Sequence, residues 1–261
     1  MEKNKITFSF GKNWQNLLKI VSEDDFNRSL DDLNRWFNNR VDLKGKDIID
    51  IGSGSGIHSL MLYTKEPANL FSFDYDKNSV AATTSLWEKA GCPKNWQVEQ
   101  GSILDKAYMG KFGKFDLVYS WGVLHHTGNM WDAIKNASEL VKPNGYFLLS
   151  IYRRVEDYEF DLALKKKYNA SSNLGKKWME WDVIWQTMKG RMRKKQNPFK
   201  WNEKRERGMN VYHDIVDWLG GLPYEVASDV QITSFLVPLG FELIEKKMSW
   251  GMGVYLFKKT S

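Results

Sequence analysis

Two adjacent histidines, His125 and His126, are the side chains of this chain best suited to proton transfer. Imidazole has an ordinary pKa of about 6.5, so at neutral pH it can take a proton from a hydroxyl group. Adjacent residues point to different sides of regular backbone, so we expect one ring to face a substrate and the other to brace its loop. The sequence leaves open which ring does which, and whether both are structural.

A glycine-rich loop from Asp50 to Gly56 follows an apolar run and precedes a helical pattern. Gly52, Gly54 and Gly56 alternate with other residues, which allows a tight turn and the close approach of a ligand to the backbone. A dinucleotide-binding loop has its third glycine one position later, where this chain has Ile57. The Gly-Lys-Ser/Thr ending of a phosphate-binding loop is also missing from the sequence.

The next apolar run ends at Asp74, and Tyr75 follows it. A carboxylate at the end of a second strand can accept hydrogen bonds from both ribose hydroxyls of a nucleoside, and the tyrosine could pack against its adenine. The glycine loop and this carboxylate together predict a site for a nucleoside-containing ligand.

Short apolar runs that alternate with helical stretches must position these residues. The candidate strands are 46–51, 70–74, 96–100, 115–120 and 146–152. Continuous apolar runs suit strands covered on both faces, and the alternation with helices predicts a parallel sheet with right-handed crossovers, the doubly wound α/β class. Near the end, a helix over 230–240 precedes two strands, 240–248 and 253–259, whose short connection requires an antiparallel pair.

Residues 153–206 break this rhythm, because they are charged, aromatic and helical in pattern, and Asn197-Pro198 interrupts them near the end. We expect an insertion that lies over the sheet. The predicted organisation is an N-terminal helical segment over 1–40, a ligand-binding core over 41–152, a helical insertion that caps the site over 153–225, and a C-terminal helix with strands over 226–261 that completes the sheet.

The formal net charge of +6 is concentrated between Arg153 and Arg207, where Lys and Arg outnumber Asp and Glu by about two to one. Such a segment can attract nucleic acid, phosphorylated substrates or an anionic membrane, or it can be a solvated helical face. Cys92 is the single cysteine, which excludes a disulfide within the chain. No apolar run reaches the roughly 18 residues of a membrane span, and the N-terminus lacks the apolar run of a signal peptide, so we expect a cytoplasmic location.

Four segments within residues 46–152 follow the order of motifs in one enzyme family: DIIDIGSGSG, SFDYD, FDLVYSWGVLHHTG and VKPNGYFLLS. In these segments the chain resembles the class I S-adenosylmethionine-dependent methyltransferases. The resemblance implies a Rossmann-like, mostly parallel seven-stranded sheet with an antiparallel last strand. It implies S-adenosylmethionine as the cofactor of the core, and S-adenosylhomocysteine as its product.

The resemblance also implies which residues contact the cofactor: Trp14, Asp50, Gly52, Ser53, Gly54, Gly56, Asp74, Tyr75, Ser102, Ile103, Ser120 and Trp121. Ser102 stands where the family often has Asp. Trp14 belongs to an aromatic N-terminal segment that the resemblance assigns to a lid, although core packing would explain it equally well.

A second cluster, RGMxxxHDxxDWxGGxPYE, resembles a segment of some bacterial class I enzymes, whose acceptor sites are built by insertions of this kind. We expect it to supply the substrate contacts Arg207, His213, Asp214, Asp217, Trp218 and Tyr224. The alternative is a capped helix and turn that only anchors the insertion. No HExxH or similar ligand spacing occurs in the sequence, so no metal is expected.

The leading functional hypothesis is O-methylation of a small hydroxyl-bearing metabolite, such as a sugar, a nucleotide-activated and hence phosphorylated polysaccharide precursor, or a natural product. The first alternative is an RNA ribose methyltransferase. Enzymes that methylate base amines usually carry Asn/Asp-Pro-Pro-aromatic where this chain has Ser120-Trp-Gly-Val123, so nucleic acid is the less favoured partner. The second alternative is a non-catalytic S-adenosylmethionine-binding subunit. The acceptor and the oligomeric state are left open.

Overall fold

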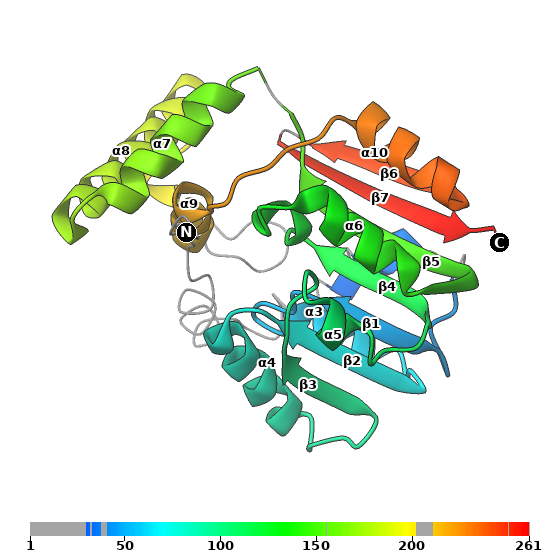
Figure 1. Ribbon diagram of the computed structural model, residues 1–261. Coiled ribbons are helices and arrows are strands. Elements are labelled where there is room, and N and C mark those ends of the chain that lie inside the picture. Colours follow the sequence, from blue (N-terminus) through cyan, green and yellow to red (C-terminus); the bar gives the residue numbers. More distant parts are fainter. Residues whose placement is uncertain are drawn as a thin grey trace.

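A twisted sheet of seven strands forms the centre of the computed structural model, which describes residues 30–31, 33–37, 41–154, 156–201, 211–249 and 251–260 (Figure 1). The strand order is β3-β2-β1-β4-β5-β7-β6. The strands are β1 Asp47–Ile51, β2 Asn69–Asp74, β3 Trp96–Gln100, β4 Phe115–Trp121, β5 Val141–Tyr152, β6 Phe241–Ser249 and β7 Met252–Lys259. Strands β1 to β5 pair in parallel, and β7 runs antiparallel to both β5 and β6. The predicted fold class, including the antiparallel last strand, is confirmed.

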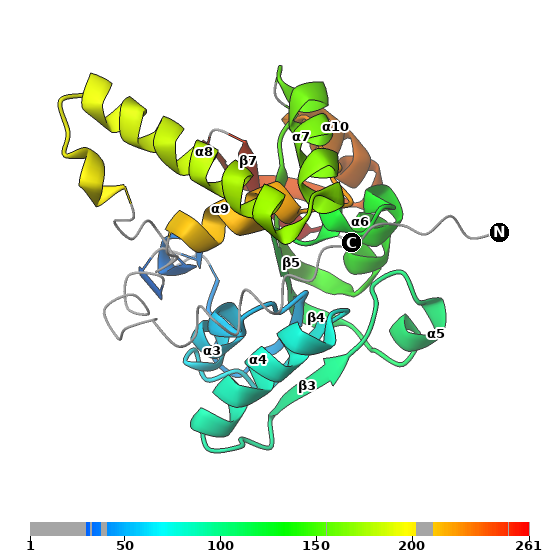
Figure 2. The same ribbon diagram turned by 90° about the vertical axis from the view of Figure 1, so that its left-hand side faces the viewer.

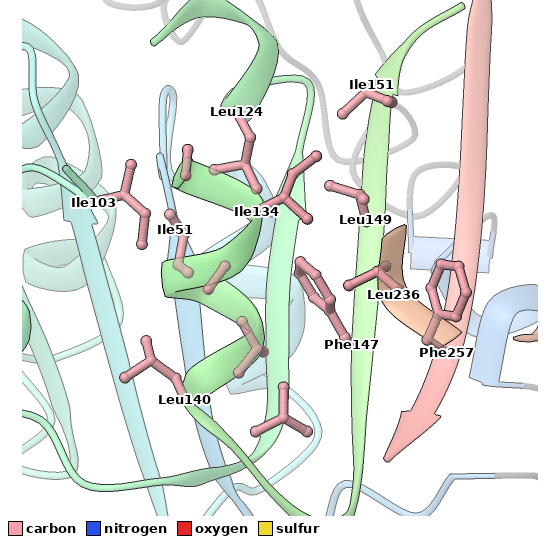
Figure 3. Close-up of a cluster of buried hydrophobic side chains, with 14 of the residues drawn as sticks. Ile51, Ile103, Leu124, Ile134, Leu140, Phe147, Leu149, Ile151, Leu236 and Phe257 are labelled. Atoms are coloured by element: carbon pink, nitrogen blue, oxygen red, sulfur yellow. The ribbon is translucent and has the colours of Figure 1, made fainter. Parts of the chain in front are cut away.

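Helices cover both faces of the sheet because alternate residues of the central strands are apolar on both sides. In β5, Phe147, Leu149 and Ile151 face one core (Figure 3). Leu148, between them, faces the other core. The first core includes α5 Lys106–Met109, α6 Met130–Glu139 and α10 Asp229–Leu236. The second includes α3 Ile57–Tyr63, α4 Lys77–Lys89 and the helical residues 33–37. This two-sided burial is the reason the strands read as continuous apolar runs.

Two element boundaries differ from the sequence prediction by more than one residue. Strand β5 begins at Val141, which pairs with Phe115, and the register then shifts before Tyr146, so the turn-forming residues between them bulge out of the ladder. Helix α10 ends at Leu236 and continues as a 3₁₀ turn over Val237–Leu239. Pro238 lies in this turn and has no N–H to continue the α-helical pattern.

The insertion leaves and rejoins the sheet at one place, the carboxyl end of β5. Arg153 forms an isolated parallel bridge with Ala227, and the Ala227 N–H donates to the carbonyl of Tyr152 at 3.2 Å. Between these points lie α7 Tyr158–Ala170, α8 Asn173–Arg193, the 3₁₀ turn η2 Pro198–Lys200 and α9 Val211–Gly220. They share a small apolar core of their own and extend away from the sheet (Figure 1). The division of the chain into four parts stays a prediction from the sequence.

The strand order reverses beside β1, which has β2 on one side and β4 on the other. Crossovers leave in opposite directions at such a point, so a crevice opens outside the carboxyl ends of the strands. The glycine loop follows β1, Asp74 ends β2, and the histidine pair follows β4, so the fold brings the three predicted features to this one edge.

Candidate active site

A cavity of about 250 Å³ lies at this edge of the sheet. One side is formed by the loop after β1 and the end of β2, with Asp50, Gly52, Ser53, Gly54, Ser55, Ile57, His58, Asp74, Asp76 and Ser79. The other side is formed by the segment after β4, the end of β5, the start of β7 and α9, with Trp121, Gly122, Val123, His125, His126, Tyr152, Met252, Asp214, Asp217 and Trp218.

The glycine loop turns tightly because its glycines adopt positive φ angles, 77° at Gly52 and 57° at Gly54. The N–H groups of Gly52 and Ser53 donate to the carbonyl of Phe73 at 2.8 and 3.1 Å, which ties the loop to the end of β2. A Cβ on Gly52 would lie 2.3 Å from Val123, so only glycine lets the loop after β4 approach so closely.

Gly56 serves helix packing rather than the cavity wall. Its φ is 79°, and a Cβ there would lie 2.6 Å from the Cα of Thr83 in α4. It is the N-cap residue of α3. The cofactor contact predicted for Gly56 stays a prediction. In the described geometry, this glycine allows α3 and α4 to approach each other closely.

Asp74 presents a fixed carboxylate to the cavity. Its Oδ2 accepts from the N–H of Gly54 at 2.9 Å, and its Oδ1 accepts from the N–H of Asp76 at 2.8 Å. Burial raises the pKa of this carboxyl to about 6, and the two backbone donors oppose that rise. Each carboxylate oxygen has capacity for a further hydrogen bond, so Asp74 can accept from two neighbouring hydroxyls.

Asp50 begins a buried chain of hydrogen bonds under the loop. It is 1% exposed, and the Ser59 hydroxyl donates to it at 2.5 Å. The Ser72 hydroxyl donates to Ser59 at 3.0 Å, and the indole N–H of Trp96 donates to Ser72 at 3.0 Å. Burial raises the pKa of Asp50 to about 7, with a smaller contribution from the charge of Asp74.

The histidine pair lies in a 3₁₀ turn, η1 Leu124–His126, directly after β4. The carbonyl of Pro223 lies 2.7 Å from Nδ1 of His126. A carbonyl only accepts, so Nδ1 carries the proton and the lone pair of the neutral ring is at Nε2. His126 is half-buried, whereas His125 has no accessible surface.

His125 packs behind His126, with ring centroids 4.2 Å apart, and neither of its ring nitrogens has a hydrogen-bond partner among the described residues. Its backbone carbonyl accepts from the N–H of Glu225 at 3.1 Å. Burial lowers the pKa of His125 well below its usual value and that of His126 to about 4, and the nearby charge of Lys165 acts in the same direction. Both rings are therefore neutral at physiological pH.

Lys165 of α7 lies behind the cavity wall and was not singled out from the sequence. It is fully buried, its ammonium group donates to the carbonyl of Trp218, and it lies 4.7 and 4.6 Å from the ring centroids of Trp218 and Tyr224. Burial lowers its pKa to about 7, against the opposing charges of Asp161 and Asp217. The one available signal is its spacing of four from Asp161, which puts both on one helix face.

The predicted substrate residues fall into three groups. Asp214, Asp217 and Trp218 line the cavity. Tyr224 lies behind it, stacked on Tyr158 and hydrogen-bonded to Asp161 at 3.4 Å. His213 contacts the ring of Tyr212 and is not part of the cavity wall. Arg207 lies outside the described residues, as does Trp14 of the predicted lid.

Several predicted cofactor residues do not line the cavity. Ser120 is buried beneath the loop, where its hydroxyl donates to the carbonyl of Ile51 at 3.1 Å. Ile103 is in the core, and the hydroxyl of Ser102 accepts from the N–H of Leu104 at 3.2 Å. Tyr75 is 72% exposed. Contacts of these residues with a cofactor stay predictions.

His58 lines the cavity although the sequence analysis did not select it. It lies in the first turn of α3, directly after the glycine loop, and its Nδ1 is 3.0 Å from the hydroxyl of Tyr119. Its ring meets that of Trp121 edge-on at 5.5 Å. A polar residue in the turn that follows a glycine loop was the signal that could have identified it.

The described part of the chain holds no group of three or more His, Cys, Asp or Glu side chains placed to bind a metal ion. It also holds no helix that is both long enough and apolar enough to cross a membrane.

Residues 42–207 match the protein family described as "Methyltransferase domain". The ubiquinone biosynthesis O-methyltransferase of Coxiella burnetii is 27% identical over 130 residues, which are 49% of this chain and 53% of that protein. The ribosomal protein L11 methyltransferase of Macrococcus caseolyticus is 29% identical over 107 residues, which are 41% of this chain and 32% of that protein. The chain thus spans about half the length, or less, of these curated relatives.

The likeness to solved structures extends over nearly the whole chain. The magnesium protoporphyrin IX methyltransferase of Synechocystis PCC 6803, solved with bound SAH, has a TM-score of 0.58 at 13% sequence identity. The match covers 95% of this chain and 93% of the other. At this level of identity, the likeness shows a shared fold.

Proposed function

This chain belongs to the methyltransferase domain family, and on that premise we propose that it methylates a hydroxyl oxygen of a small molecule. Membership confirms the predicted resemblance to the class I methyltransferases, whose methyl donor is S-adenosylmethionine. When bound, that cofactor supplies a methyl group on a positively charged sulfur, which a nucleophile can displace in line. The work of the chain is to hold the cofactor, orient the acceptor and accept its proton.

The half of the cavity next to β1 and β2 fits such a cofactor. Gly52 and Gly54 form a tight turn, and because they have no side chains a ligand can approach their backbone closely. Beside this turn, the fixed carboxylate of Asp74 can accept hydrogen bonds from two ribose hydroxyls. Asp76 adds a further carboxylate to the lining of the same half, which suits a cationic sulfonium ligand.

The other half of the cavity, formed by the segment after β4 and by α9, is our candidate acceptor site. His126 carries the proposal, because its Nδ1–H is held by the carbonyl of Pro223 and the lone pair needed for proton transfer is then at Nε2. We assign the role of general base to His126. His125, without accessible surface, acts as packing behind it.

The chemistry of this half favours an aromatic alcohol among the acceptors considered. Trp121, Tyr152 and Trp218 offer ring faces for stacking. A base whose pKa is lowered to about 4 removes a proton more readily from a phenolic hydroxyl than from a sugar hydroxyl. The described lining contains no Lys or Arg, so a phosphorylated acceptor finds no cationic partner in it. We therefore place a phenolic natural product ahead of a sugar or a nucleotide-activated precursor.

The test is transfer from isotopically labelled S-adenosylmethionine to three matched panels: phenols, sugars with their nucleotide-activated forms, and total RNA. We expect products of added methyl mass from the phenols, with the label on oxygen by fragmentation. Label on RNA ribose would favour the alternative of an RNA enzyme. S-adenosylhomocysteine binding without any labelled product, from these panels or from a cell extract, would favour a non-catalytic subunit.

A further inference from the structure

Helix α8 lies on the outside of the insertion (Figure 2). Several apolar side chains along this helix are exposed. Leu174, Trp178, Trp181, Trp185 and Met192 are 78%, 78%, 61%, 50% and 47% exposed. Their spacings of three, four and seven residues put them on one side of the helix. At 1.5 Å per residue, the row is about 27 Å long. We call these five residues the tryptophan row.

The core of the insertion does not account for the tryptophan row. Helix α8 already packs another side, with Glu180 and Ile184 buried against α7 and α9. None of the row residues lines the cavity at the sheet edge. Phe199, in η2 at the end of α8, is 82% exposed and adds a further aromatic side chain. A helix in a globular domain needs one apolar face, so a second one marks a binding surface.

Positive charge surrounds the C-terminal half of the row. The stretch from Val183 to Trp201 contains no Asp or Glu, and its cations are Lys189, Arg191, Arg193, Lys194, Lys195 and Lys200. Lys189 lies over the ring of Trp185, with its ammonium nitrogen 5.3 Å from the centroid. Indole rings beside Lys and Arg side chains are the composition that lies at the headgroup level of a bilayer.

We propose that the tryptophan row and the cations that follow it dock this protein on the surface of an anionic lipid bilayer. The helix would lie in the plane of the surface, with its indoles among the headgroups and its cations near the lipid phosphates. A second copy of the chain is a poorer occupant, because the same cations would meet across the interface. The row is a helix side rather than the positively charged groove that single-stranded RNA requires. The proposal is independent of the acceptor proposed above.

The test is flotation of the protein with vesicles of phosphatidylcholine alone, or of phosphatidylcholine with a quarter phosphatidylglycerol. We expect at least roughly tenfold stronger binding to the anionic vesicles, weakened by salt. Trp178→Ser/Trp181→Ser/Trp185→Ser should lose that binding, and Lys194→Glu/Lys195→Glu should weaken it about tenfold. The matched controls are Val230→Ser/Val237→Ser, which removes exposed apolar side chains elsewhere, and Lys89→Glu/Lys94→Glu, which reverses exposed cations elsewhere. Both should bind as the unaltered protein does.

Three outcomes would overturn the proposal: no binding to anionic vesicles, equal binding to both vesicle types, or full binding by the triple variant. Light scattering tests the alternative that a second copy of the chain covers the row. A dimer that the triple substitution converts to a monomer, in a protein that does not bind vesicles, would assign the row to self-association. If the triple variant does not fold, two other measurements test the proposal. These are vesicle binding by Lys194→Glu/Lys195→Glu and quenching of the unaltered protein's tryptophan fluorescence by brominated lipids. Unquenched fluorescence would then reject the bilayer.

Discussion

The carbonyl oxygen of Pro223 accepts a hydrogen bond from Nδ1 of His126 at 2.7 Å, although the two residues are far apart in the sequence. Two residues further on, the N–H of Glu225 donates to the carbonyl of His125. The segment that returns from the insertion therefore holds the histidine turn from outside the sheet. The segment that follows α9 and the proposed base are thus joined by hydrogen bonds.

The first prediction separates the two histidines. His126→Ala should lower turnover by about 10²–10⁴-fold, the usual contribution of a general base, with little change in S-adenosylhomocysteine affinity. His125→Ala should chiefly lower the free energy of unfolding, by about 1–3 kcal/mol, because it empties packed space behind His126. Steady-state kinetics, calorimetric binding and urea denaturation measure these effects. Near-native turnover of a folded His126→Ala variant would remove the base from the mechanism.

The second prediction concerns the pH dependence of turnover. An imidazole of ordinary pKa would give activity that rises through about pH 6.5. Burial lowers the pKa of His126 to about 4, and only the neutral ring accepts a proton, so the base is already competent at pH 5.5. Turnover at saturating cofactor and acceptor should change less than about twofold between pH 5.5 and 7.5. A tenfold rise over that interval would contradict the lowered pKa or the assignment of the base.

The third prediction concerns Asp74 and the cofactor. Its pKa is raised to about 6, and only the carboxylate accepts from both ribose hydroxyls, so S-adenosylhomocysteine affinity should fall as the pH drops below about 6. Asp74→Ala should weaken binding at pH 8 by about 1–3 kcal/mol through the lost hydrogen bonds. Asp74→Asn is the matched control, because it cannot titrate and its affinity should no longer fall below pH 6. Calorimetric titrations at pH 5 and 8 would contradict the assignment if both proteins showed the same pH dependence.

The sequence was sufficient for features that depend on local patterning. The runs that became β1, β2, β4 and β5 are buried on both faces, and the glycine loop was recognisable because its turn needs positive φ. Features that depend on tertiary approach were not predictable. The bond to His126 comes from a backbone carbonyl at Pro223, which leaves no side-chain signature. The surroundings of Lys165 form only when α7 meets α9, and a run of three lysines in sequence resembles a solvated surface.

The fourth prediction concerns Asp50 and stability without cofactor. Its folded pKa is raised from an ordinary 3.8 to about 7, so between these values the folded protein keeps a proton that the unfolded chain loses. This group therefore makes stability fall as the pH rises from about 4 to 7. Asp50→Asn removes that cost and can still accept from Ser59. The variant should be more stable than the unaltered protein at pH 8 and equally stable near pH 4. Urea denaturation measures the free energy of unfolding of both proteins. If the difference between the two values did not change with pH, Asp50 would not be a buried, titrating carboxyl.

The last prediction concerns Lys165. Its folded pKa is lowered from 10.5 to about 7, so between these values the unfolded chain binds a proton that the folded protein has lost. Stability from this group therefore rises with pH over that interval, by at most about 1.4 kcal/mol per pH unit. Lys165→Met keeps most of the side-chain volume and should abolish the rise. Lys167→Met, on the same helix but exposed, should keep it.

The same substitution should alter the acceptor site, because the ammonium group is hydrogen-bonded to the carbonyl of Trp218, which lines the cavity. Without that bond, the Trp218 wall is less well fixed. In Lys165→Met, the fold increase in the KM for the acceptor should exceed the fold decrease in turnover. The affinity for S-adenosylhomocysteine should stay near its original value, because Asp74 and the glycine loop lie on the other side of the cavity. Parallel pH–stability curves for the unaltered and Lys165→Met proteins would show that this lysine is not buried as a titrating group. An unchanged KM for the acceptor would show that Lys165 has no part in shaping the acceptor site, even if it is buried.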